Sequence, residues 1–263
     1  MLLPEVQEMA RTTEKFWGWT KNGMFIGGND DMIALRFHNG HGYEEVTREL
    51  WRRCCKNAKY VVDVGTHSGI FSLDAFRAGA QKVLSCEPHV VNFSRMALNL
   101  RYNGFTAYGA FYGAIGDEDR IGTLLCKAMP FVCYAAGRMD LHSKDAFEFP
   151  VNMRRLDTLI KPEYWPEIKV IKIDAENYTP KVINGMAGIF RAGNRPDLII
   201  ECTESGMGDQ LKALGYKFWR IWETGQIEEV DDLKPHNPNN NYNGTDEDCR
   251  NRFASITGLP QEE

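Results

Sequence analysis

The chain has 263 residues, of which 43% are hydrophobic and 25% are charged, an ordinary composition for a globular protein with a large core. Its formal net charge of −5 disfavours a broad nucleic-acid-binding surface, and no apolar run approaches the ~20 residues of a membrane span. The seven cysteines lack metal-ligand spacing, and the first residues lack the basic patch and apolar run of a signal peptide. We therefore expect free thiols in a cytoplasmic protein.

Residues 1–55 predict an N-terminal extension of a helix and a hairpin, packed on a main domain of residues 56–263. The first 20 residues have amphipathic helical spacing and end in aromatic side chains. Packing of these aromatics onto the body is the first interpretation, and a lid or a dimer contact in a homo-oligomer is the alternative. Residues 24–28 and 32–37 flank a polar turn and predict the two strands of the hairpin.

The stretch of residues 60–69 predicts a strand, a glycine turn and the start of a helix. It opens with a valine-rich run, which is typical of a strand buried on both faces. The turn has the pattern D-x-G-x-x-x-G from Asp63 through Gly65 to Gly69, without the middle glycine of a dinucleotide fingerprint. It therefore disfavours a nicotinamide or flavin cofactor and favours the nucleoside site for S-adenosylmethionine. A tight turn that binds nothing is the alternative.

A second short apolar strand ends in an acid, Glu87. Glu87 comes 24 residues after Asp63, close to the ~20-residue spacing at which such units place a carboxylate on ribose hydroxyls. An ordinary solvated acid at a strand end is the alternative. The register with the glycine turn favours the ribose role.

Further strands alternate with helices along the rest of the chain, which predicts right-handed crossovers in a mostly parallel sheet. A third strand ends at Gly116 and Asp117, and the stretch IKVIKIDAENY is a fourth strand. We expect an α/β, Rossmann-like fold with a seven-stranded sheet, helices on both faces and an antiparallel last strand. The segment from Gly122 to Pro150 predicts an excursion that lines the substrate pocket.

Taken together, these patterns resemble the FkbM-type family of S-adenosylmethionine-dependent methyltransferases. The matching stretches run in the family's order from about residue 42 to residue 222: VVDVGTHSGIFSL, CEPHVVNFSRMALNLRYNG, AIGDE, RRLDTLI, IKVIKIDAEN and RPDLIIECTE. The second and fifth of these stretches are the most selective. Two departures stand out: Asn177 and Tyr178 follow the acid where the family usually has glycine, and His67-Ser68 replace small or apolar residues.

The resemblance implies a class I methyltransferase fold and a cofactor site built from three strand ends. Gly65, Thr66 and Gly69 would hold the methionine end of the cofactor, with His67 in the same turn. Glu87, followed by Pro88, would bind the ribose, and Asp117 would meet the adenine amine. Asp63 would orient the turn.

Lys172, Asp174 and Glu176 have i, i+2, i+4 spacing at a strand end, so they would share one face if the strand continues. Either carboxylate could accept a proton from the methyl acceptor, and the lysine would lower their pKa values by its charge. A structural ion pair is the alternative interpretation of this group. His67 is a second candidate base.

Glu201 ends the next strand, where Asp174 and Glu176 could meet it. Three carboxylates could hold Mg²⁺, although a carboxylate network without metal is favoured. We predict O-methylation of a hydroxyl on a sugar, a glycan or a small natural product, without nucleic acid as a partner. The alternative is a catalytically silent S-adenosylmethionine-binding module that serves as a partner in an assembly.

Overall fold

The computed structural model of the protein describes residues 17–20, 23–27, 32–38, 42–106, 108–127, 138–139, 146–201, 206–233 and 251–261. The strands are β1 (Trp17–Trp19), β2 (Phe25–Gly27), β3 (Tyr60–Val64), β4 (Val83–Glu87), β5 (Gly109–Tyr112), β6 (Ala114–Ile115), β7 (Arg120–Lys127), β8 (Arg138–Met139), β9 (Ala146–Arg154), β10 (Ile168–Ile173), β11 (Asp197–Glu201), β12 (Lys217–Ile221), β13 (Ile227–Val230) and β14 (Asn251–Ser255). The helices are α2 (Met32–His38), α3 (Glu45–Cys55), α4 (Ile70–Arg77), α5 (Val90–Tyr102), α6 (Leu156–Leu159), the 3-10 helix η2 (Pro162–Glu167), α7 (Thr179–Asn184), α8 (Ala187–Arg191) and α9 (Gly208–Ala213).

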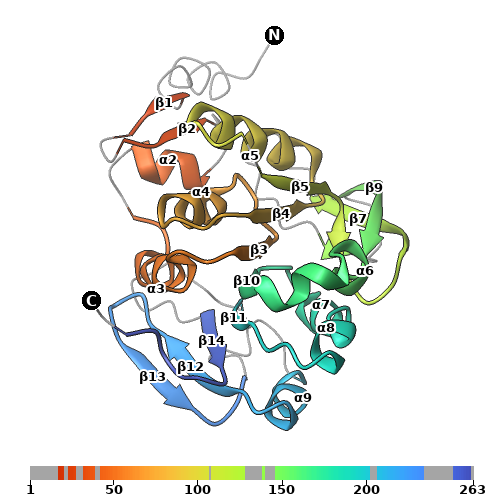
Figure 1. The fold of residues 1–263 in the computed structure, drawn as a ribbon. Coiled ribbons are helices and arrows are strands. Elements are labelled where there is room, and N and C mark those ends of the chain that lie inside the picture. Colours follow the sequence, from red (N-terminus) through yellow and green to blue (C-terminus); the bar gives the residue numbers. More distant parts are fainter. Residues whose placement is uncertain are drawn as a thin grey trace.

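An eight-stranded mixed sheet forms the centre of the fold, in the order β13-β12-β14-β11-β10-β3-β4-β5 (Figure 1). The strands from β11 to β5 are parallel, whereas β14 pairs antiparallel with both of its neighbours. The predicted Rossmann-like sheet with an antiparallel last strand is therefore confirmed. The expected count of seven strands is wrong, because the chain turns back after β12 and adds β13 at the edge. The N–H of Trp222 closes this turn on the carbonyl of Gln226, at 2.8 Å.

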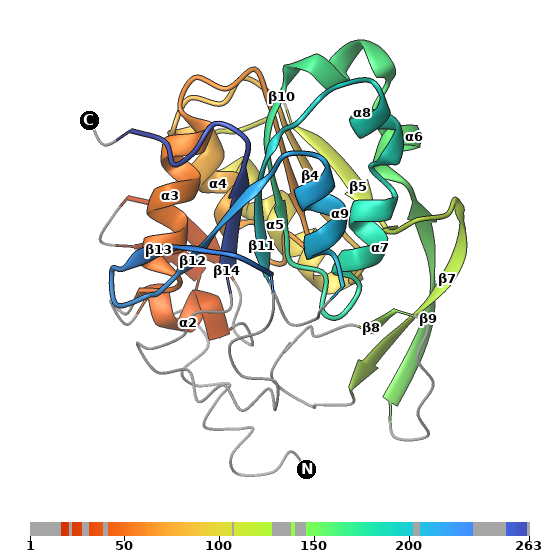
Figure 2. The same cartoon turned by 90° about the horizontal axis from the view of Figure 1, so that it is seen from below.

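Helices cover both faces of the central sheet, as Figure 2 shows for α3 and α4 on one side and α7, α8 and α9 on the other. Strand β3 illustrates why most of its sequence is apolar, with Asp63 as the exception. Val62 and Val64 pack toward α7 and α8, while Val61 packs toward α3 and α4. A strand covered on both faces buries every side chain, so its sequence does not alternate. Among the described helices, none combines the length and the hydrophobicity that a membrane-spanning helix needs.

A smaller sheet, in the order β6-β9-β7-β8, leaves the central sheet at the predicted third strand. That strand divides at Gly113 into β5, which pairs with β4, and β6, which pairs with β9. The predicted excursion therefore contributes the long antiparallel pair β7–β9. The buried face of this sheet packs on Ala175 and Tyr178, which follow β10. Residues 128–137 and 140–145 of this excursion lie outside the described residues.

The N-terminal hairpin differs from the prediction. Strand β2 pairs with β1 rather than with residues 32–37, which form helix α2. Within α2 the buried side chains Ala34 and Phe37 are three residues apart, so a helix places both against the core, whereas a strand would point them to opposite faces. The helix expected before β1 lies outside the described residues, and the division of the chain at residue 55 stays a prediction.

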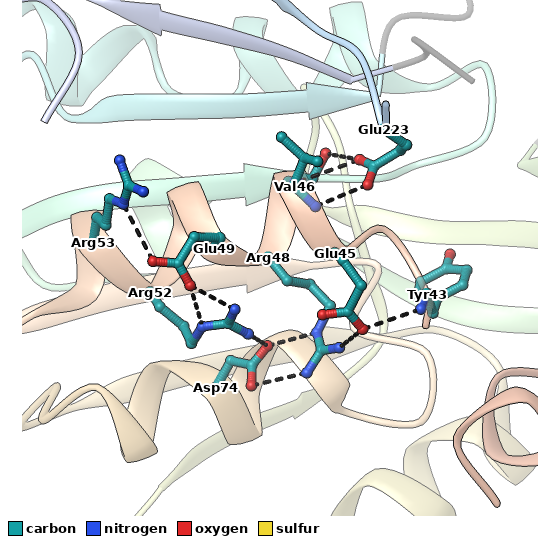
Figure 3. A network of polar contacts seen from close by, with 10 residues as sticks. Tyr43, Glu45, Val46, Arg48, Glu49, Arg52, Arg53, Asp74 and Glu223 are labelled. Carbon is teal, nitrogen blue, oxygen red and sulfur yellow. Dashed lines mark hydrogen bonds and ion pairs between the residues drawn. The ribbon is translucent and has the colours of Figure 1, made fainter. Parts of the chain in front are cut away.

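A network of ion pairs and hydrogen bonds joins α3 to α4 and to the turn after β12 (Figure 3). Arg48 is buried and donates from Nε and Nη2 to the two carboxylate oxygens of Asp74, at 2.6 and 3.1 Å. Glu223 accepts the N–H groups of Val46 and Thr47, at 2.9 and 3.2 Å. These N–H groups belong to the first turn of α3, which lacks partners within the helix. Glu223 thus anchors the start of α3 to the central sheet.

Candidate active site

The turn predicted to hold the cofactor, here called the cofactor turn, comprises residues 65–69 between β3 and α4. Close packing explains its glycines. Gly65 has a φ of 76°, and a Cβ there would overlap the backbone carbonyl oxygen of Asp174. Gly69 has a φ of 87° and lies against Met96. A side chain at Gly65 would therefore separate β3 from the segment that follows β10. Packing alone explains both glycines, so the turn pattern by itself does not establish a ligand.

Asp63 organises the cofactor turn from inside the sheet. Its Oδ2 accepts hydrogen bonds from the hydroxyls of Thr66 and Ser72, both at 2.7 Å. The other oxygen, Oδ1, is fully buried and finds no hydrogen-bond partner among the described residues. Burial raises the pKa of Asp63, and the charge of Lys172 and the two hydroxyls offset only part of this effect. An acceptor oxygen is therefore held, without a partner from the described part of the chain, beside the turn.

Glu87 ends β4 with a carboxylate whose two oxygens are both oriented by the backbone. The N–H of His67 donates to Oε2 and the N–H of His89 donates to Oε1, each at 2.9 Å, across the intervening Pro88. Only 4% of Glu87 is exposed. Burial raises its pKa, while the charge of His67 and the two N–H donors act in the opposite direction. Burial and the neighbouring His67 also lower the pKa of His89. The cofactor turn and the end of β4 are thus joined through one carboxylate.

The buried Lys172, in β10, forms an ion pair at the next strand end. Its Nζ donates to Oδ2 of Asp174 at 2.8 Å and lies 4.3 Å from the centre of the Phe71 ring. Burial alone would lower the pKa of Lys172. The negative charge of Asp174, together with two further carboxylates, outweighs burial and raises this pKa above its ordinary value. Lys172 is therefore a fixed cation under the reaction loop, which we define as residues 174–178.

The prediction that Lys172, Asp174 and Glu176 share one face required β10 to continue to Glu176. The strand ends before that residue. Strand β10 ends at Ile173, and Glu176 and Asn177 both have left-handed backbone conformations, with φ values of 44° and 67°. The carboxylates nevertheless meet, because the tight loop turns Glu176 back. The ligand atoms of Asp174, Glu176 and Glu201 all lie within 4.8 Å of one another.

These three carboxylates offer the oxygen ligands that Mg²⁺ prefers. Lys172 already places a positive charge against one of them, Asp174. The group can therefore be balanced by a divalent cation, or by the lysine and hydrogen-bond donors of a ligand. The geometry of the three carboxylates is compatible with both interpretations of the sequence, a Mg²⁺ site and a carboxylate network without metal.

Within the described part of the chain, the hydrogen bonds of Asp117 are with residues outside the carboxylate cluster. Its Oδ2 accepts a hydrogen bond from Lys181 of α7 at 2.8 Å, and its carbonyl accepts one from Arg155 at 3.1 Å. The predicted contact with adenine would thus share a carboxylate with an ion pair. By contrast, direct hydrogen bonds join Asp63 to Thr66, and Lys172 to Asp174.

Two residues at this end of the sheet were not singled out from the sequence. Glu44 precedes α3, and its Oε2 accepts a hydrogen bond from Nδ2 of Asn251 at 3.0 Å. Asn251 begins β14 and pairs in register with Glu201. No local motif marks either residue, because their contact spans 207 positions of the sequence.

The comparison with known families decides what kind of protein this is. The family model described as the methyltransferase FkbM domain matches residues 63–233, more than half of the chain. The chain belongs to the FkbM methyltransferase family. The matched segment begins at Asp63 and includes the cofactor turn, Glu87 and the reaction loop. No curated protein sequence is significantly similar to the chain.

Several solved structures resemble this FkbM family member weakly. A methyltransferase from Geobacter sulfurreducens is 12% identical, with 97% of this chain and 90% of that chain covered and a TM-score of 0.43. The ribosomal protein L11 methylase from Lactobacillus delbrueckii subsp. bulgaricus is 13% identical, with coverages of 67% and 71% and a TM-score of 0.38. A Trypanosoma brucei PRMT1 enzyme-prozyme complex with AdoHcy is 27% identical over 26% of this chain, with a TM-score of 0.24, and the chain spans 22% of that protein's length. The family assignment rests on the sequence match.

The structure gives a physical account of the main departure from the FkbM pattern. Asn177 stands where the family usually has glycine, and its φ is 67°. Asparagine is among the non-glycine residues that adopt this left-handed conformation most readily. The sequence changes, but the backbone geometry that glycine favours is kept. Tyr178, which belongs to the same departure, is buried and donates to Sδ of Met153 at 3.4 Å, which fixes the loop on the smaller sheet.

Proposed function

We propose that this protein is an S-adenosylmethionine-dependent methyltransferase that methylates a hydroxyl of a sugar, a glycan or a small natural product. Membership of the FkbM family supports methyl transfer as the activity. The main structural support is the contact between the cofactor turn and the reaction loop. The N–H of Asp174 donates to the carbonyl of Val64 at 3.0 Å, and its own carbonyl fills the space beside Gly65. A candidate base therefore lies against the candidate cofactor site.

The residues of the cofactor site suit the proposed ligand. The Glu87 carboxylate is held by two N–H donors, and a ribose offers two hydroxyl donors that such a carboxylate can accept. Asp63 keeps a buried acceptor oxygen without a partner among the described residues. A bound S-adenosylmethionine would supply a methyl group that is already activated for displacement. The chain's task is then to orient the acceptor and remove its proton.

Asp174 is the proposed base for the acceptor hydroxyl. The ammonium group of Lys172, at 2.8 Å, favours the ionised carboxylate that can take up a proton. Glu176 lies close enough to Asp174 to accept a second hydrogen bond from the acceptor. His67 fits the base role less well, because its backbone N–H is bonded to Glu87 at the proposed ribose contact.

The experiment is a transfer assay with S-adenosylmethionine carrying a labelled methyl group. The purified chain is incubated with separate pools of monosaccharides, oligosaccharides and small alcohols, and with a cell extract. We expect label in at least one hydroxyl-bearing product, and ~10²- to 10⁴-fold slower labelling with Asp174→Asn. Binding of the cofactor without transfer to any pool would instead support the silent module. Label on an amine would retain the methyltransferase but contradict O-methylation.

A further inference from the structure

Two asparagines of α5, Asn99 and Asn103, bind the N-terminal strand β2 through its backbone. They are four residues apart and therefore lie on one face of the helix, beside β2 (Figure 1). Asn103 accepts the N–H of Phe25 at 3.0 Å and donates to the carbonyl of Phe25 at 2.7 Å. Its side-chain amide thus pairs with β2 as the backbone of a neighbouring strand would. Strand β2 precedes residues 63–233, the segment that matches the family.

Asn99 also binds β2, and in addition it reaches the cofactor turn. Its Oδ1 accepts the N–H of Gly27 at 2.8 Å, and its Nδ2 donates to the carbonyl of Ser68, also at 2.8 Å. Asn99 and Ser68 are both fully buried. A backbone N–H can only donate and a carbonyl can only accept, so these two partners fix the direction of the Asn99 amide. One buried side chain therefore links β2 to the cofactor turn.

The peptide unit between Ser68 and Gly69 is held at both of its ends. The N–H of Gly69 donates to the carbonyl of Thr66 at 2.8 Å, while Asn99 binds the carbonyl of Ser68. Gly69 has a φ of 87° and directly precedes α4, whose first turn offers N–H groups that lack partners within the helix. The orientation of this peptide unit therefore decides where the chain leaves the cofactor turn and in which direction α4 begins.

Met96 supports the same part of the cofactor turn by packing. It is fully buried and lies three residues before Asn99, on the same side of α5. A Cβ at Gly69 would lie only 2.8 Å from Cγ of Met96, so the helix and the turn are in close contact. Helix α5 thus makes an apolar contact with Gly69 and a polar contact with Ser68. Loss of the polar contact would leave a buried carbonyl without this donor, which is costly.

We propose that Asn99 is a positioning residue of the cofactor site, which holds the peptide unit between Ser68 and Gly69 in the orientation that binds S-adenosylmethionine. This inference rests on the proposed function, because it assumes that the cofactor turn binds this ligand. Asn99 acts through the turn and does not itself contact the cofactor. Strand β2 takes part by fixing the direction of the Asn99 amide, so the N-terminal region contributes to the cofactor site.

The test is calorimetric titration of wild type and Asn99→Ala with S-adenosylmethionine. Without the Asn99 donor the peptide unit can turn away, and we expect the affinity to fall about 3- to 10-fold, the size of one hydrogen bond between neutral groups. In the transfer assay, KM for the cofactor should rise by a similar factor, with little change in turnover at saturating cofactor.

Asn99→Asp is the second variant, for the case in which Asn99→Ala does not fold. The side chain keeps its size, and the ionised carboxylate can still accept the N–H of Gly27 but cannot donate to the carbonyl of Ser68. Titration at mildly alkaline pH favours the ionised form. The affinity for S-adenosylmethionine should then fall at least as far as in Asn99→Ala.

Asn103→Ala is the matched control, because Asn103 binds the same strand, and its described hydrogen bonds are with Phe25 and with the backbone of Asn99. Thermal melts should show a loss of stability in both alanine variants, whereas the cofactor affinity of Asn103→Ala should equal that of wild type. Equal weakening of cofactor binding in the two variants would show a merely structural role for Asn99 and overturn the inference.

The same titrations separate failure of this inference from failure of the proposed function. If wild type does not bind S-adenosylmethionine, the proposed function fails and this inference fails with it. If wild type binds the cofactor and folded Asn99 variants bind it equally well, the inference about Asn99 is overturned and the proposed function stands.

Discussion

Two clusters of charged residues differ in their ratio of cations to carboxylates. One lies between α3 and α4, and the other lies beyond the ends of β10 and β11. Between the helices, three arginines face three carboxylates in ion pairs of 2.6–3.4 Å: Arg48, Arg52 and Arg53 with Glu45, Glu49 and Asp74 (Figure 3). Beyond the strands, the buried Lys172 lies among carboxylates that outnumber it. We call the first cluster balanced, because its described charges pair one to one, and the second unbalanced, because its described carboxylates outnumber the one described lysine among them.

This difference separates a structural use of charge from the functional use that we propose. A balanced, hydrogen-bonded network needs nothing from outside and ties α3 to α4. A cluster of several carboxylates around one lysine can take up a proton, a cation or a hydrogen-bond donor, which is a property of binding sites. Changes in the first cluster should therefore alter stability, and changes in the second should alter binding or turnover.

The largest expected effect is that of Asp174→Asn in the unbalanced cluster. If Asp174 is the general base, this change should lower turnover ~10²- to 10⁴-fold with little change in cofactor affinity, because the shape is kept and the proton acceptor is lost. Turnover and calorimetric affinity of the same purified variant provide the measurement. Dependence on added Mg²⁺, with silencing of wild type by a chelator, would assign Asp174 as a metal ligand. Loss of thermal stability with normal specific activity would make it structural.

Next in size is the effect of Asp74→Ala in the balanced cluster. The variant leaves the buried guanidinium of Arg48 without its main carboxylate partner, which should destabilise the fold by about 3–5 kcal/mol. Denaturant unfolding measures the change, and cofactor affinity at low temperature should stay near that of wild type. The matched control is Glu49→Ala, whose exposed ion pairs should contribute about 0–1 kcal/mol. Equal effects of the two variants would contradict a special role for the buried pair.

A smaller effect is expected at the start of α3. Glu223→Ala removes the acceptor for two N–H groups of the first turn and for the Thr47 hydroxyl, 2.6 Å away. Loss of such a cap should lower the free energy of unfolding by roughly 0.5–2 kcal/mol. Glu223→Gln, which keeps an acceptor, should recover part of this loss. A thermal melt of both variants that matches wild type would show that Glu223 does not stabilise α3.

Much of the central sheet follows from the sequence because its signals are local. The valine-rich run of β3, the glycine turn and the acid at the end of β4 each lie within a few residues. The pairing of Lys172 with Asp174 also follows from a spacing of two. The sequence predicts a strand where α2 lies, because seven residues are too few to tell the helical repeat of 3.6 from the strand repeat of 2. Only the packing of Ala34 and Phe37 against the core identifies the helix.

The contacts that complete the site could not be predicted because they join distant parts of the chain. Glu44 and Asn251 meet only when the segment before α3 and the last strand reach the same end of the sheet. The left-handed backbone at Asn177 likewise became clear only from the coordinates, although asparagine in place of the family's glycine was a signal for it. The added strand β13 depends on a short turn after β12 that carries no strong sequence pattern.

Calorimetric titration of Glu87→Ala with S-adenosylmethionine tests the central claim most directly. The backbone N–H groups of His67 and His89 orient the carboxylate oxygens of Glu87, which should accept hydrogen bonds from the ribose hydroxyls. Wild type should bind, and loss of this charge-assisted contact, at roughly 1.5–3 kcal/mol, should weaken binding about 10- to 150-fold. Glu163→Ala, at an exposed position in η2, is the control and should bind like wild type. Unchanged affinity in a folded Glu87→Ala variant would contradict the assignment and place the ribose elsewhere.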